Sequence, residues 1–122
     1  MQRTLVVSMV LMLAVATLLF TTPVLASDEH DCMHEPTIQS LRDCVSHAAH
    51  AGHITNQGVA KSLFAKLDAA QSALDRGQTG VAINNLKAFV QAVEAQAGKH
   101  IAAEHAAHMA MHAQHVIDAL RQ

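Results

Sequence analysis

Apolar residues recur every three or four positions over most of the chain after residue 35, which is typical of amphipathic helices. Four such segments are expected, at about 36–51, 57–76, 80–97 and 100–121. Glycines or short polar turns separate them, and no segment shows the alternating pattern of a β-strand. This arrangement predicts an all-α fold, a small antiparallel four-helix bundle.

Residues with known preferences for helix ends support these boundaries. Pro36 suits the first turn of the first helix, and Gly52 suits the stop that follows it. Thr55 or Asn56 is expected to cap the second helix. Residues 78–80 are expected to form the turn before the third helix.

The first 26 residues have the features of an export signal. A basic start is followed by an apolar run over 5–20, by Pro23 and by a small residue, Ala26, at a typical cleavage position. We expect residues 1–26 to be removed as a signal peptide, and an uncleaved membrane anchor is the alternative.

Cleavage would leave two regions, an acidic arm over 27–35 that contains histidine, cysteine and methionine, and a helical bundle domain over 36–122. We expect this product to be periplasmic or secreted, with no membrane association after cleavage.

The composition of the part after residue 26 argues against nucleic acid as a partner. Its net charge is about −3 with neutral histidines, so it would not attract a polyanion. Phe64 and Phe89 are its only aromatic side chains, and single-stranded nucleic acids bind by stacking on such rings.

The two cysteines, Cys32 and Cys44, both follow the export signal. Because exported proteins meet an oxidising compartment, we expect a disulfide that ties the arm to the first helix. If unstrained, it would stabilise the fold by up to about 3 kcal/mol. Metal thiolates or a redox pair are the alternative, although the spacing is not C-x-x-C.

Histidine is the strongest anomaly of composition, since all ten histidines follow the export signal. Four of them follow steps of three, four and three on the last helix and share an arc of about 80° that flanks its apolar face. Neighbours at this spacing meet on a helix surface and can chelate a metal ion. They are His105, His108, His112 and His115.

The expected topology brings more histidines to this stripe, because the first and last helices of an up-down bundle are antiparallel neighbours. One cluster is predicted where the first helix ends and the last begins, and another where the arm meets the far end of the last helix. The first would contain His47, His50, His53, His100, His105 and His108, and the second His30, His34, His112 and His115.

The ligand types favour a transition metal, with copper first and zinc or nickel next, since imidazole suits all three. Met111 lies on the polar side beside the stripe and is a candidate thioether ligand, whereas Met109 falls on the apolar face and is expected in the core. The leading hypothesis is an exported, non-catalytic protein that binds or buffers this metal. Alternatives are incidental surface histidines and a sensor of pH.

Three stretches, 61–70 (KSLFAKLDAA), 80–90 (GVAINNLKAFV) and 93–99 (VEAQAGK), resemble the FIMAH domain. The resemblance extends over about 53–121 and is most specific over 58–101. It implies a helical accessory module of secreted bacterial proteins, without catalytic residues to carry over. The alternative function is therefore an interaction or structural module of the cell envelope or of secreted enzymes.

The sequence contains none of the common catalytic motifs that its histidines could serve. No H-E-x-x-H is present, and His100 and Glu104–His105 are spaced one residue too far apart for H-x-x-E-H. We therefore expect no catalytic residues and no enzyme activity. The expected partners are metal ions and another exported protein.

Overall fold

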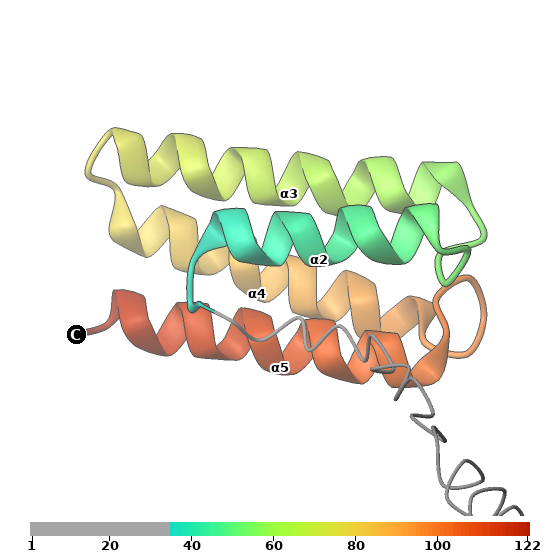
Figure 1. Cartoon of the computed structure of the whole chain (residues 1–122). Coiled ribbons are helices and arrows are strands. Elements are labelled where there is room, and N and C mark those ends of the chain that lie inside the picture. The colour runs from blue at the N-terminus through green and yellow to red at the C-terminus, as the bar shows by residue number, and fades with distance from the viewer. Residues whose placement is uncertain (1–34) are drawn as a thin grey trace, which may run out of the picture.

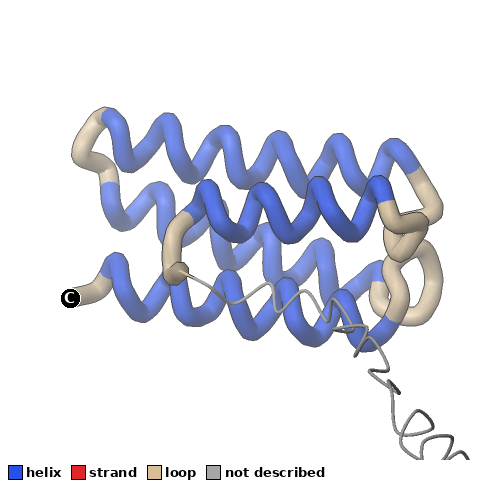
Figure 2. Tube along the Cα trace, in the orientation of Figure 1, coloured by secondary structure: helices blue, strands red, loops and turns tan. Residues whose placement is uncertain are grey.

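The computed structural model describes residues 35–122, and they form an all-helical bundle (Figure 1). Between the helices lie short turns and loops, and the only β-type pairings in this part of the chain are isolated bridges (Figure 2). The predicted fold class is confirmed. The helices are α2 (Ile38–His50), α3 (Gln57–Asp75), α4 (Thr79–Gln96) and α5 (Ala103–Leu120).

The four helices run alternately up and down, so that each is antiparallel to the next (Figure 1). Helix α4 packs against α3 and α5, and α2 closes the bundle by packing against the same two helices. The seam between α2 and α5 therefore joins the first and last helices of the described bundle, as the sequence predicts. None of the helices described in residues 35–122 is long and apolar enough to span a membrane.

Helices α2 and α3 begin at polar side chains that accept hydrogen bonds from their first turns. The Thr37 hydroxyl accepts from the Ser40 backbone N–H at 3.1 Å, so Pro36 precedes the helix instead of opening it. Of the two predicted caps for α3, Asn56 is the one used. Its side-chain oxygen accepts from the N–H groups of Gly58 at 2.8 Å and Val59 at 3.2 Å.

Two predicted boundaries differ from the structure. Thr79 and Gly80 belong to the first turn of α4 and not to the preceding turn, because Gly77, with φ of 71°, already reverses the chain. Helix α5 begins at Ala103 instead of residue 100. The chain leaves α4 through Gly98, with φ of 73°, and residues 97–102 form a connecting loop.

One hydrophobic core runs through the bundle and receives side chains from every helix. Met109 is fully buried, which confirms the prediction from its place on the apolar face of α5. Phe89 is also fully buried, whereas Phe64 lies at the edge of the core. The largest apolar side chains that are fully buried in it are Leu41, Leu63, Leu67, Leu86, Phe89, Ile101, Met109 and Ile117.

The side chain of Arg42 holds α2 on α3 at the surface. Its guanidinium pairs with the Asp68 carboxylate and lies over the ring of Phe64, 5.2 Å from the ring centroid. The ion pair is largely exposed and so contributes little by itself, but the cation–π contact adds about 0.5–1 kcal/mol.

At one end of the bundle the α2–α3 loop meets the α4–α5 loop (Figure 1). The Thr55 N–H donates to the His100 carbonyl at 2.9 Å, and the Ala102 N–H donates to the His53 carbonyl at 2.9 Å. Between these bonds Ile54 and Ile101 form an antiparallel bridge, and both side chains are buried. This pairing fixes His53 beside the first turn of α5.

Several predictions concern residues outside the described part of the chain. The signal peptide and most of the arm fall there, and so do His30, Cys32 and His34. The cleavage site and the proposed domain division stay predictions.

Replacing the α3 cap by alanine should destabilise the bundle. Asn56→Ala removes the acceptor of two backbone N–H groups, and we expect a loss of about 1 kcal/mol in the free energy of unfolding, measured by urea denaturation. The neighbouring exposed Gln57→Ala is the matched control and should change stability by less than about 0.5 kcal/mol. Equal losses in the two variants would show that the Asn56 cap is not stabilising.

Candidate functional site

The eight histidines of the described residues are concentrated toward α2, α5 and the loops that join them to the bundle. They divide between the two ends of the α2–α5 seam, and His30 and His34, which the sequence also predicts for the far end, lie outside the described residues. At the end where the two loops pair, three of them act electrostatically on a fourth, His105, and we call these four the corner cluster. Its members are His47 on α2, His53 in the α2–α3 loop, and His105 and His108 on α5.

His53 and His105 form the centre of the corner cluster. Their rings stack with centroids 3.7 Å apart and an angle of 18° between the planes, and both side chains are partly buried. The contact exists because the loop pairing places the His53 carbonyl on the Ala102 N–H, just before the turn of α5 that carries His105. His47 and His108 are exposed on either side of the seam.

The surroundings of His105 favour its uncharged form. Burial lowers the pKa of its imidazole below the ordinary 6.5, and a charge on His53 lowers it next. The Glu104 carboxylate acts in the opposite direction, while His108 and His47 lower the pKa further. Three other imidazoles therefore disfavour a proton on His105.

The other two histidines predicted for this end lie at its margin. His50 and His100 are both exposed, and His100 uses its backbone carbonyl to bind the α2–α3 loop. In residues 35–122 no three side chains among histidine, cysteine, aspartate and glutamate are arranged to hold a metal ion. The corner cluster therefore brings imidazoles near one another, but they are not arranged as a coordination shell.

At the far end of the seam His112 is buried, whereas the sequence pattern predicts that it flanks the core. Its side chain is 1% exposed, because α2 and the segment before it cover this part of α5. The Nε2 atom donates to the Glu35 carbonyl at 2.8 Å, since a carbonyl can only accept, and lies 3.4 Å from Ser40 Oγ. Nδ1 is buried without a hydrogen-bond partner. His112 therefore fixes the start of α2 against α5.

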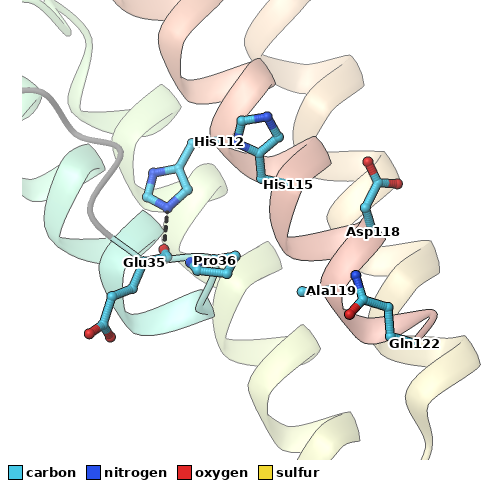
Figure 3. A pocket seen from close by; sticks show the side chains of 7 residues that line it. All are labelled: Glu35, Pro36, His112, His115, Asp118, Ala119 and Gln122. Carbon is cyan, nitrogen blue, oxygen red and sulfur yellow. Dashed lines mark hydrogen bonds between the residues drawn. The ribbon is translucent and has the colours of Figure 1, made fainter.

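Beside His112 is a pocket of about 320 Å³, which Figure 3 shows from close by. Its polar groups do not converge on one point. The Glu35 carboxylate points away from His115 and Asp118 (Figure 3). The Asp118 carboxylate accepts from the Gln114 amide at 3.0 Å and pairs with Arg121 at 3.4 Å. The residues that line the pocket are Glu35, Pro36, His112, His115, Asp118, Ala119 and Gln122.

Met111, predicted as a thioether ligand, and Cys44, predicted to form a disulfide, have different surroundings. Met111 is 44% exposed on α5, as its place on the polar side predicts. Cys44 is buried in the core between α2 and its neighbours. Its predicted partner, Cys32, lies outside the described residues, so the disulfide stays a prediction.

Sequence reasoning missed two features of this seam. It did not predict the ring stack of His53 and His105, because the stack depends on backbone pairing between two loops that are far apart in the chain. It also did not predict the burial of His112. The helical wheel places His112 nearer the apolar face than His108 and His115, but His105 lies nearer still and is only partly buried, so this position alone does not identify the buried histidine.

Replacing His112 should cost stability, because it removes a buried ring and leaves the Glu35 carbonyl without its donor. We expect His112→Ala to lower the free energy of unfolding by about 2–4 kcal/mol in thermal or urea denaturation. His115→Ala, on the same helix but exposed, should change it by less than about 0.5 kcal/mol. A neutral His112→Ala would contradict a structural role for this histidine.

Stability should fall with acidification because of His105. Its pKa is lowered in the folded protein, so the unfolded chain takes up a proton first as the pH falls below 6.5. As the pH falls, the loss in the free energy of unfolding begins near the pKa of His105 in the unfolded chain and continues down to its pKa in the folded protein. At higher pH this loss is absent.

Urea denaturation from pH 8 to pH 5 should therefore show a smaller loss of stability in His105→Gln than in the native chain. The exposed His115→Gln is the control and should retain the native slope. An unchanged slope in His105→Gln would contradict the assignment.

The comparison with known families covers the whole bundle. The model of the FIMAH domain matches residues 38–118, about two thirds of the chain. The match includes α2, which the sequence resemblance alone placed outside the family, and it ends near the last turn of α5. No curated protein and no solved structure matches the chain. The match spans all four described helices, and the chain belongs to the FIMAH domain family.

Proposed function

We propose that this chain is a non-catalytic accessory module that acts outside the cytoplasm by binding another exported protein. The observation that carries the proposal is the extent of the family match. It runs from the first residue of α2 to within two residues of the end of α5, so the described fold corresponds to the FIMAH module. The FIMAH domain is a helical accessory domain and not a catalytic family.

The hydrogen bonds and ion pairs of the surface aspartates support a non-catalytic role. Asp43, Asp75 and Asp118 each accept from a glutamine one helical turn earlier, and Asp68 pairs with Arg42. Such pairs within and between helices stabilise a helical surface. Catalytic acid–base chemistry instead requires a carboxylate or imidazole directed at a substrate cleft.

Export is part of the proposal and rests on the N-terminal sequence. The apolar run, Pro23 and Ala26 are typical of a cleaved signal peptide. The mature module would then meet its partner in the periplasm or outside the cell. The family resemblance favours the same location, since it implies a module of secreted bacterial proteins.

A second candidate function is the binding or buffering of a transition metal, with copper favoured over zinc and nickel. One observation favours it, namely the corner cluster. Histidines from α2, from a loop and from α5 meet at one end of the seam, and His53 contacts His105 directly. The two functions are compatible, because a metal-binding corner would occupy only a small part of the module.

Site-specific photo-crosslinking in the native host tests the first proposal. A photoreactive amino acid would replace Val81 or Met111, the two most exposed large apolar residues in the described structure. We expect at least one position to capture the same exported protein in repeated experiments. The captured protein, once purified, should bind the native chain with a Kd of about 10 μM or lower in the presence of a metal chelator.

The exposed Lys87 on α4 provides a matched position for the crosslinker without an apolar side chain. Failure of every captured protein to bind the purified chain would contradict the proposal. Turnover of a substrate by the purified chain would contradict the non-catalytic assignment.

A further inference from the structure

We infer that the contact between His112 and the segment before α2 is sensitive to acid. The neutral ring holds this segment on α5, and uptake of a second proton makes the ring leave its buried position and release the segment. In residues 35–122 His112 is the only polar or charged residue that is buried, at 1% exposed. Such a release goes beyond the proposed function, since it requires neither a partner protein nor a metal ion.

The hydrogen bonding of the buried ring accommodates one proton and not two. Nε2–H donates to the Glu35 carbonyl at 2.8 Å, so the neutral ring carries a lone pair and no proton at Nδ1. Nδ1 is buried and has no hydrogen-bond partner. A second proton would therefore create a buried N–H without an acceptor, together with a buried charge. Both disfavour the ring in this position.

The elements packed around the ring offer no opposite charge to a proton at Nδ1. Figure 3 shows this nitrogen turned away from His115 and Asp118, and the Glu35 carboxylate is directed away as well. Helix α2 presents the Ser40 hydroxyl to Nε2 and, one turn later, the buried Cys44 thiol. Hydroxyl and thiol groups ordinarily stay uncharged in acid. The side chains that α3 and α4 bury in the described core are all apolar.

The neighbouring turns of α5 add charges of the same sign as the incoming proton. His108 and His115 lie one turn before and one turn after His112, on the same side of the helix. Both are exposed, and exposed imidazoles become charged in acid, so they disfavour a proton on His112. The Asp118 carboxylate is already paired with the Arg121 guanidinium at 3.4 Å.

The pocket beside His112 gives a charged ring access to water. Its volume is about 320 Å³, and His112 forms part of its wall. The other residues that line it are exposed, apart from the half-buried Ala119. Rotation of the His112 side chain into this pocket would hydrate the charge and bring it toward the carboxylates of Glu35 and Asp118. The same rotation breaks the hydrogen bond from Nε2 to the Glu35 carbonyl, so the segment before α2 is no longer held on α5 by this bond.

Other contacts should confine the release to the start of α2. Val45 and Ala48 are buried in the core, and Arg42 joins the helix to Asp68 on α3. The pairing of the two loops holds the chain just after α2. We therefore expect acid to free the first turn of α2 and the segment before it while the rest of the bundle stays folded.

Amide hydrogen exchange of the purified chain tests the inference, followed by NMR from about pH 7.5 down to the pH at which the bundle unfolds. The probes are the N–H groups of Ser40 and Leu41, which donate to the side chain and the carbonyl of Thr37 at 3.1 Å. The Leu67 N–H, in the middle of α3, is the internal reference. Ring ¹⁵N shifts report the second proton on His112. As it is taken up, Ser40 and Leu41 should lose at least about tenfold in protection relative to Leu67.

His112→Gln separates the titration of the ring from its hydrogen bond. A glutamine amide can donate to the Glu35 carbonyl but takes up no proton, so the protection of Ser40 and Leu41 should stay within about twofold as the pH falls. His115→Gln, one turn later on α5 and exposed, is the matched control and should show the native loss. Equal losses in the two variants would overturn the inference.

The native chain alone decides the inference if His112→Gln does not fold. A second proton on the His112 ring without loss of protection at Ser40 and Leu41 would contradict it. So would acid unfolding in which Ser40, Leu41 and Leu67 lose protection together, because no local release would then precede unfolding. Neither result bears on the proposed function, because binding of a protein partner is measured separately.

Discussion

The backbone pairing between the α2–α3 loop and the α4–α5 loop is the contact on which this end of the bundle depends. Two hydrogen bonds of 2.9 Å flank the Ile54–Ile101 bridge, and both isoleucines close the end of the core. The pairing joins the chain just after α2 to the chain just before α5, so it sets the register of the seam between the first and last helices. Without it, the His53 backbone would be held to α2 by its N–H bond of 2.8 Å to the Ala48 carbonyl, but nothing would tie it to the α4–α5 loop just before His105.

The histidines of the described residues have different surroundings and different roles, although the composition alone does not distinguish them. His112 is a buried structural residue whose Nε2–H holds the Glu35 carbonyl and thereby the start of α2. His53 and His105 are a stacked pair at the opposite end of the same seam. His50, His100 and His115 are exposed. Burial and backbone pairing, and not the number of histidines, decide which of them can act together.

The helical fold could be predicted because it depends on local patterns. The apolar spacing located four helices to within a few residues, and the position of Met109 on the helical wheel correctly predicted its burial. The site was less predictable. His112 lies at the border between the apolar and polar faces of α5, and only the packing of α2 and residues 35–37 decides that it is buried. The His53–His105 stack depends on two loops that meet only in the folded chain.

The chain is thus a FIMAH-family helical module with an unusual concentration of imidazoles at one corner. The loop pairing brings His53 and His105 into direct contact. The most direct test is a nuclear Overhauser measurement between the ring protons of these two residues in chain labelled at histidine. We expect a strong cross-peak between the His53 and His105 rings, and the peak should persist in the variant His50→Ala/His115→Ala. A well-folded chain with sharp resonances for both rings and no cross-peak between them would contradict direct contact of the two rings.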